Sequence, residues 1–306
     1  MRGPRTTVVA SEDGIGRLLV DYSVLLRPRI AGLVAFTAFI SAVLAGGPNA
    51  GFGAAIEVAL WVTLSAGAGS VLNQVLEKDT DGLMSRTADR PLPCGRISSR
   101  DAILFAAALG MASIIGLAAR FSILSALFAA ATILVYVAVY TPLKRYSTLN
   151  TVPGAFAGAA PPVIAWAAVT GGLEGWGVWL AAILFVWQFP HFMAIAWMYR
   201  DEYRGAGIQM LAGVEGGSEI AGRQALQQAI VLLPLVLLPG VAGVAGPIFT
   251  FGALFAGVIY AGYALRFARN QTKATARGLL LASLAYIPFV YSLALFDPIV
   301  QLAILN

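Results

Sequence analysis

The sequence predicts an all-α integral membrane protein, a bundle of about nine transmembrane helices. Hydrophobic residues make up 59% of the 306 residues and charged residues only 11%, which is outside the range of an ordinary soluble domain. Apolar stretches of about 20 residues, enough to cross roughly 30 Å of hydrocarbon as helices, recur along the whole chain. They lack the alternating pattern of a membrane β-barrel, and a helix is the other structure that satisfies its own backbone in lipid.

The expected spans follow one another with short connections. They cover residues 24–45, 54–76, 102–119, 122–140, 152–169, 177–199, 225–243, 247–267 and 277–296. The 33 glycines suit close helix packing in lipid, where small side chains let backbones approach. We expect residues 1–23 to form a cytoplasmic amino-terminal segment and residues 24–306 to form a single polytopic transmembrane domain.

The basic residues predict the orientation of the bundle. The 20 Lys and Arg residues gather in the amino-terminal segment and in the loops after spans two, four, six and eight, and only Arg120 lies at the opposite end. By the positive-inside rule these loops and the amino terminus lie in the cytoplasm. A bacterial inner membrane is the simplest location. The same topology explains the net charge of +5 without nucleic acid, and the single cysteine, Cys94, excludes an internal disulfide.

The loop after the second span carries acids that topology does not explain. If the second helix continues through it, Asn73, Glu77 and Asp81 follow each other at i, i+4 and i+8 and share one face. Like charges at this spacing repel unless a cation lies between them, and Mg²⁺ prefers oxygen ligands that leave room for water and phosphate. Arg86 and Arg90 follow, and guanidinium groups suit phosphate oxygens. This pattern predicts a magnesium-diphosphate site; the alternative is a solvated loop of paired charges.

A second acidic cluster occurs four spans later. Asp201, Glu202 and Arg204 follow the sixth span. Two acidic helix ends separated by matching numbers of spans predict two pseudo-repeated four-helix halves plus one helix, with both clusters facing one cavity. The expected metal ligands are Glu77, Asp81, Asp201 and Glu202.

The segments around these clusters resemble the intramembrane polyprenyl transferases of the UbiA type. The first motif is similar to the N-x-x-x-D-x-x-x-D signature of that family, with Glu77 where most members have Asp, and Glu202 stands where a second Asp is frequent. Other segments resemble the protoheme IX farnesyltransferase, or haem O synthase, branch of the family, and together they cover the cytoplasmic loops and most of the chain. They are Arg86–Leu92, Tyr140–Arg145, Ala160–Pro162, Trp166–Gly171, Trp187–Phe192 and Ala196–Ile208.

This resemblance implies transfer of the farnesyl group of farnesyl diphosphate to a vinyl group of haem B, with addition of water, to give haem O and diphosphate. It implies Mg²⁺ as cofactor, contact with membrane lipids, and a haem A synthase or terminal-oxidase assembly factors as candidate protein partners. The implied catalytic residues are Asn73, Glu77, Asp81 and Asp201. The implied diphosphate ligands are Arg86, Arg90, Tyr140, Lys144, Arg145 and Arg204.

His191 is the only histidine in the chain and lies within the sixth span. An ionisable residue inside a membrane helix is a functional candidate, and imidazole is a common haem-iron ligand. We therefore expect His191, with Gln188 and Trp187, to bind haem; a hydrogen-bonded structural histidine is the alternative. Aromatic side chains are expected to line a dry cavity around the farnesyl cation, although ordinary helix packing would also explain them. They are Trp61, Tyr136, Tyr140, Trp166, Trp187, Phe189 and Phe192.

Two other functions fit parts of the sequence. A transferase that prenylates an aromatic acid or quinone precursor would use the same diphosphate site, but the segments Tyr140–Arg145 and Trp187–Phe192 resemble the haem branch. A haem carrier or transporter would explain His191 but not two acidic clusters flanked by arginines.

Overall fold

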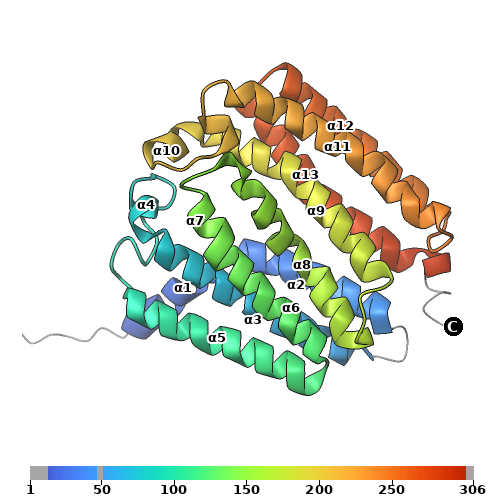
Figure 1. The fold of residues 1–306 in the computed structure, drawn as a ribbon, viewed down its shortest axis with the longest axis horizontal. Helices are drawn as coiled ribbons and strands as arrows, with labels where there is room; N and C mark the ends of the chain where they lie inside the picture. The colour runs from blue at the N-terminus through green and yellow to red at the C-terminus, as the bar shows by residue number, and fades with distance from the viewer. Residues whose placement is uncertain (1–12, 47–50, 301–306) are drawn as a thin grey trace, which may run out of the picture.

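The chain forms a bundle of long helices joined by short connections (Figure 1). A computed structural model describes residues 13–46 and 51–300. Most of the expected amino-terminal segment, including Arg2 and Arg5, lies outside the described residues. What the structure describes of this segment is the helix α1 (Asp13–Leu25).

Nine helices among the described residues are long and apolar enough to cross a membrane, which confirms the predicted number. Six are single helices: α2 (Pro28–Gly46), α3 (Gly51–Leu76), α5 (Ser99–Arg120), α9 (Trp176–Met198), α12 (Pro247–Arg269) and α13 (Lys273–Phe296). A seventh, α11 (Gly217–Val241), begins at Gly217 rather than at the expected residue 225. Two are composite: α6 (Ile123–Leu134) continues through the π-helix η2 (Val135–Tyr140) into α7 (Thr141–Leu143), and the 3₁₀ turn η3 (Thr148–Asn150) leads into α8 (Thr151–Thr170).

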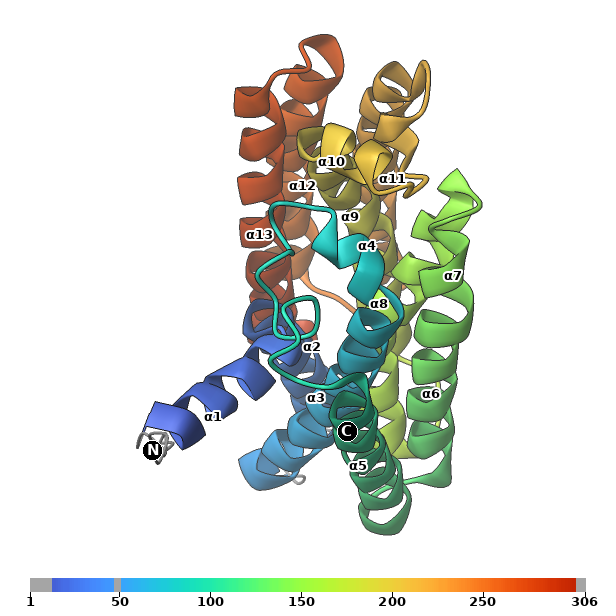
Figure 2. The same cartoon turned by 90° about the vertical axis from the view of Figure 1, so that its left-hand side faces the viewer.

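The first span begins later than the sequence suggested because the helix breaks at Arg27. Arg27 has a φ of +52°, a left-handed conformation that ends α1 and lets α2 begin at Pro28. The rigid ring of proline is well suited to the first turn of a helix. The helix α1 lies at an angle to the spans (Figure 2), and an ion pair between Asp21 and Arg96 (3.0 Å) holds it against the loop between α4 and α5.

The buried side chains form two large clusters. One joins α9, α11, α12 and α13 and also includes residues of α2 and α8, and the other joins α2, α3, α5, α6 and α8. Two of the expected cavity aromatics are used in this packing. A Cβ on Gly116 would lie 2.7 Å from the ring of Trp61, and one on Gly175 would lie 2.5 Å from that of Trp166. Both tryptophans therefore make close packing contacts, as the alternative of ordinary packing expects, and their role in lining a cavity stays a prediction.

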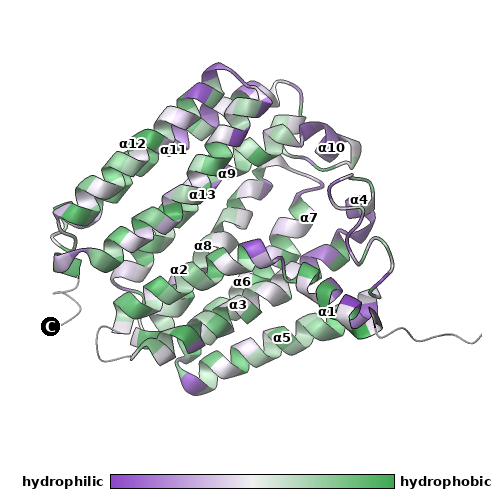
Figure 3. Cartoon of the chain, turned by 180° about the vertical axis from the view of Figure 1, so that it is seen from behind, coloured by the Kyte–Doolittle hydropathy of each residue, from purple (hydrophilic) through white to green (hydrophobic). Residues whose placement is uncertain are grey.

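The loops after spans two, four and six meet at one end of the bundle. Figure 1 places the short helices α4 (Lys78–Gly82) and α10 (Arg200–Gly205) together there, and Figure 3 shows hydrophilic residues collected around them and α1. Met84 of the first loop packs with Tyr203 and Ile208 of the third. The Gln209 N–H donates to the carbonyl of Lys144 (2.6 Å), which ties in the second loop. These contacts join the three loops into a cap at this end of the bundle.

The shared end of these loops predicts their accessibility in membranes. We expect a membrane-impermeant maleimide to label the exposed Cys94 and a cysteine at Arg204 from the same, cytoplasmic side. A cysteine at Arg120, in a Cys94→Ser background, should react only from the other side. Labelling of right-side-out and inverted vesicles measures this, and opposite reactivity of Cys94 and the Arg204 position would contradict the topology.

Candidate functional site

The acidic face predicted from the sequence exists in the structure. The helix α3 ends at Leu76 and α4 begins at Lys78, but the backbone hydrogen bonds continue between them. Glu77 N–H donates to the Asn73 carbonyl (2.9 Å), and Asp81 N–H donates to the Glu77 carbonyl (2.7 Å). The three side chains therefore stack on one face. All three residues are buried, with exposed fractions of 0% for Asn73, 8% for Glu77 and 2% for Asp81.

Each residue of this face is bound by a cation from a different segment. The contacts are Arg27 Nη2 to Asn73 Oδ1 (3.0 Å), Lys144 Nζ to Glu77 Oε1 (2.7 Å) and Arg90 Nη1 to Asp81 Oδ2 (2.7 Å). Charge-assisted bonds of this length are among the stronger hydrogen bonds in proteins. The site is therefore a buried network of hydrogen bonds and ion pairs between two carboxylates, one amide and three cations at the end of the bundle.

Arg27 is a site residue that no motif in the sequence indicates. Its left-handed backbone, which costs a bulky L-residue about 1–2 kcal/mol, directs the side chain to Asn73. Its Nε is buried without a hydrogen-bond partner among the described residues. Burial lowers the pKa of Arg27, but the surrounding phenols and carboxylates raise it more, so the net shift is upward. A cation with a spare buried donor is suited to an anionic ligand.

Lys144 is held between a carboxylate and an aromatic ring. Its Nζ lies 4.3 Å from the centre of the Tyr140 ring, besides its contact with Glu77. Burial lowers the pKa of Lys144, but Tyr140 and Glu77 raise it more, so Lys144 remains a cation. A Cβ on Gly154 would lie 2.7 Å from the Tyr140 ring, so only glycine fits there without displacing the ring.

The π-helix η2 places two tyrosines beside the acidic face. The rings of Tyr136 and Tyr140 lie 5.1 Å apart. Thr141 donates to the Tyr136 carbonyl (2.8 Å) and accepts a hydrogen bond from the Asn73 amide (2.9 Å), which connects the π-helix to α3. Single-turn π-helices are frequent at functional sites. This one is not recognisable from hydropathy.

The two predicted arginines of the first loop have different surroundings. Arg90 pairs with Asp81, and burial together with the positive charge of Arg27 lowers its pKa. Arg86 instead joins the two acidic loops. Its Nη2 donates to the Tyr203 hydroxyl (3.1 Å), and its backbone N–H lies 3.4 Å from a Glu202 carboxylate oxygen.

The second acidic cluster does not join the first in a single preformed metal site. The Asp201 side chain is 77% exposed and lies 3.9 Å from Arg200. Within residues 13–46 and 51–300, no group of three or more His, Cys, Asp or Glu side chains is placed to hold a metal ion. The inner carboxylates of Glu77 and Asp81 are instead paired with Lys144 and Arg90. Metal binding by the four predicted acids stays a prediction.

Two further predicted diphosphate ligands make backbone contacts in the structure. Arg204 donates to the Gly213 carbonyl (2.8 Å), and Arg145 donates to the Leu76 carbonyl (3.3 Å) at the end of α3. Both are exposed. Their positions are at the cap, but neither contacts the acidic face.

The predicted haem residues on α9 divide into packing and polar contacts. Gln188 uses its amide N–H groups on the carbonyls of Ala155 (3.0 Å) and Leu184 (3.1 Å), and a Cβ on Gly158 would overlap its side chain. Gln188 therefore connects α9 to α8, and its predicted haem contact stays a prediction. His191 is only partly buried, and its ring stacks on Trp187 with centroids 4.9 Å apart.

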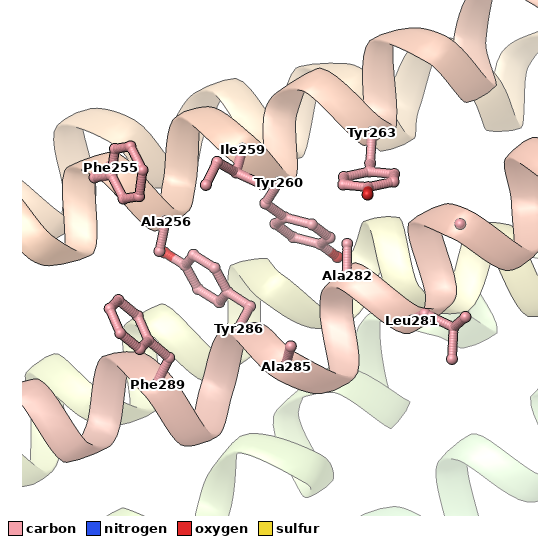
Figure 4. Close-up of a pocket in the computed structure, with 11 residues that line it drawn as sticks. Phe255, Ala256, Ile259, Tyr260, Tyr263, Leu281, Ala282, Ala285, Tyr286 and Phe289 are labelled. Carbon is pink, nitrogen blue, oxygen red and sulfur yellow. The ribbon is translucent and has the colours of Figure 1, made fainter.

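Two apolar cavities lie on the outer surfaces of the spans. A cavity of about 610 Å³ lies between α12 and α13, lined by aromatic residues such as Phe255, Tyr263 and Phe289 (Figure 4). Another, of about 750 Å³, lies between α6, α8, α9 and α11 and includes Phe156. Several lining side chains are exposed where lipid would surround the helices. Neither cavity includes Asn73, Glu77 or Asp81, so both suit apolar chains rather than a charged group.

The family model and the relatives that match this chain all point to one family. Residues 34–295 match the model of the UbiA prenyltransferase family. A protein called protoheme IX farnesyltransferase from Solibacter usitatus is 43% identical over 236 residues, which is 76% of this chain and 80% of that protein. Proteins of the same name from Koribacter versatilis and Brucella anthropi are 39% and 37% identical, covering 93% of this chain and 95% and 92% of their own.

Solved structures share the fold at low sequence identity. A digeranylgeranylglyceryl phosphate synthase superposes with a TM-score of 0.74 at 15% identity, covering 94% of this chain and 99% of its own. A UbiA homologue from Archaeoglobus fulgidus bound to DMAPP and Mg²⁺ superposes with a TM-score of 0.64 at 17% identity, covering 90% of this chain and 99% of its own. At this sequence identity, the superpositions show a shared arrangement of helices.

Proposed function

Because the chain belongs to the UbiA prenyltransferase family, we propose that it transfers the farnesyl group of farnesyl diphosphate to a vinyl group of haem B. Water completes the new side chain, and the products are haem O and diphosphate. The observation that carries the proposal is the buried face of Asn73, Glu77 and Asp81 with its three cations. The relatives called protoheme IX farnesyltransferase supply the identity of the two substrates. A haem A synthase or terminal-oxidase assembly factors are the expected recipients of the product.

The cations of the site suit the leaving group. When the bond between farnesyl C1 and the diphosphate oxygen breaks, both electrons go to the diphosphate, and preorganised positive charge lowers the barrier. Arg27 has a spare buried donor, and Arg90 and Lys144 extend from two loops over the same face. In the proposal these three groups bind diphosphate oxygens and hold the allylic carbon beside Tyr136 and Tyr140.

The donors on this face fit Mg²⁺ in combination with a diphosphate. Mg²⁺ is usually bound through one or two carboxylates together with substrate phosphates, so a three-carboxylate cage is not required. Glu77 and Asp81 supply two buried carboxylates, and Asn73 supplies an amide oxygen. They would hold the ion, with Asp201 and Glu202 as candidates from the loop after span six. When bound, Mg²⁺ neutralises charge on the departing diphosphate.

No side-chain nucleophile is needed for the transfer. The π electrons of the haem vinyl group form the new bond to farnesyl C1, which leaves a cation on the carbon next to the porphyrin. Water adds to that carbon and loses a proton. The electron-rich faces of the paired Tyr136 and Tyr140 rings favour the first cation until the vinyl group reacts.

One assay distinguishes this function from its alternatives. Purified protein is incubated with farnesyl diphosphate, Mg²⁺ and either haem B or 4-hydroxybenzoate, and products are identified by mass spectrometry. The proposal expects haem O from haem B and no prenylated 4-hydroxybenzoate. The reverse result would indicate a quinone-precursor transferase, and haem binding without any product would indicate a carrier.

His191 is expected to act on haem and not on the diphosphate. Because His191 is on α9, away from the acidic face of α3, His191→Ala should weaken haem binding roughly 30-fold and shift the haem absorbance. The KM for farnesyl diphosphate should remain unchanged. Spectral titration with haem, alongside a thermal melt, measures both. A variant with wild-type spectra and turnover would remove His191 from the mechanism.

A further inference from the structure

We propose that Ser283 is a positioning residue that holds His191 as the Nδ1–H tautomer and leaves Nε2 as an unprotonated nitrogen able to bind haem iron. The tautomer is deduced from hydrogen-bond geometry alone; the role of the free nitrogen rests on the proposed function. Ser283 lies on α13, 92 residues from His191 in the sequence, and is completely buried.

The hydrogen bonds of Ser283 allow one assignment of the His191 proton. The Ser283 hydroxyl has a single hydrogen, and its Oγ lies 2.6 Å from the carbonyl oxygen of Leu280. A carbonyl can only accept, so the hydroxyl donates to Leu280. His191 Nδ1 lies 2.7 Å from the same Oγ. Since the hydroxyl hydrogen is already used, Nδ1 must carry the hydrogen of this contact.

Backbone and ring contacts set the orientation of the imidazole. The Trp187 indole N–H donates to the Ser283 carbonyl (2.9 Å), and the Trp187 ring stacks on His191 at 24°. The Tyr260 hydroxyl donates to the Trp187 carbonyl (3.2 Å), which fixes this turn of α9 from a third helix. The imidazole is therefore held by α13 and by its own helix, independently of any ligand.

The consequence concerns the second ring nitrogen. In a neutral imidazole one nitrogen is a donor and the other has a free lone pair. With the hydrogen on Nδ1, the lone pair is on Nε2, which has no hydrogen-bond partner among the described residues. Metal-ligating histidines usually donate their other N–H to a fixed acceptor, which selects the tautomer and orients the ring. Ser283 with the Leu280 carbonyl behind it provides such an acceptor.

The uniqueness of His191 makes the tautomer directly measurable. Protein labelled with ¹³C and ¹⁵N only in histidine gives one imidazole spectrum, and solid-state NMR in lipid bilayers shows which nitrogen is protonated. The proposal expects the protonated nitrogen to correlate with Cγ, because only Nδ1 is bonded to that carbon. A protonated nitrogen that correlates with Cδ2 would overturn the proposal, whether or not the protein makes haem O.

The matched variants are Ser283→Ala and Ser292→Ala. Both serines lie on α13 and donate to a carbonyl of their own helix, but Ser292 bonds to Pro288 (2.7 Å) at an exposed position. Ser283→Ala removes the acceptor of His191 and keeps the backbone carbonyl that binds Trp187. We expect it to shift the proton toward Nε2 and to weaken haem binding about 10-fold, as loss of an acceptor behind a ligand does.

The result for Ser292→Ala should match the unaltered protein in tautomer and in haem affinity. Equal thermal melts for the two variants would show that the change in tautomer is not a loss of folding. A Ser283→Ala variant that keeps the Nδ1–H tautomer and normal haem affinity would overturn the role of Ser283. Failure of the incubation with farnesyl diphosphate and haem, with the Nδ1–H tautomer present, would instead count against the proposed function.

Discussion

Replacing Asp81 with Asn or Glu77 with Gln should lower farnesyl transfer by about 1,000-fold while the protein stays folded. Each substitution removes a negative charge needed to hold Mg²⁺ against the diphosphate, and loss of one strong electrostatic contact in a transition state costs about 100- to 1,000-fold. The amide keeps an oxygen for the cation that binds there, Arg90 or Lys144, so neither cation loses its hydrogen-bond acceptor. Steady-state turnover and Mg²⁺ titration measure the effect.

The control for these variants is Glu57→Gln on the same helix. Glu57 forms an ion pair with Arg120 (2.9 Å) at the opposite end of α3, where no site residue lies. The Glu57→Gln variant should keep normal turnover. If Glu77→Gln or Asp81→Asn behaved like Glu57→Gln, the buried acidic face would have no part in the reaction. Removing Lys144 is a less informative test, because an unpaired buried carboxylate can destabilise a protein by about 3–5 kcal/mol.

Arg27→Gln should raise the KM for farnesyl diphosphate about 100-fold. A hydrogen bond to a charged group contributes about 1.5–3 kcal/mol, and the upper part of this range corresponds to roughly 100-fold in affinity. Arg27 is suited to such a bond because its Nε has no partner among the described residues and its net pKa shift is upward, so it remains charged. Initial-rate kinetics with varied farnesyl diphosphate measure the change, with haem held constant.

Arg29→Gln is the matched control for Arg27. Arg29 has the same charge two residues later, but its side chain is exposed. Its removal should change the KM for farnesyl diphosphate by no more than about twofold. Water and salt screen an exposed charge, so it contributes little to binding. Equal effects of the two substitutions would mean that the segment acts through its general positive charge, and Arg27 would not be a diphosphate ligand.

The helices and the acidic face could be predicted from the sequence because each depends on a local repeat. Nine apolar stretches of membrane length predicted nine spans, and the structure describes nine. The spacing of Asn73, Glu77 and Asp81 predicted one shared face, and two backbone bonds across the end of α3 produce it. These features need only the pitch of a helix and the thickness of a bilayer.

The partners of those residues were decided by the tertiary structure. Arg27 reaches Asn73 across 46 residues, Lys144 reaches Glu77 across 67, and His191 meets Ser283 across 92. Neither the exposure of Asp201 nor the packing role of Gln188 could be predicted from the sequence pattern. Such pairings depend on how separate helices pack and on a single left-handed residue between α1 and α2. A hydropathy or charge pattern is a property of one segment, whereas a buried ion pair exists only when two segments meet.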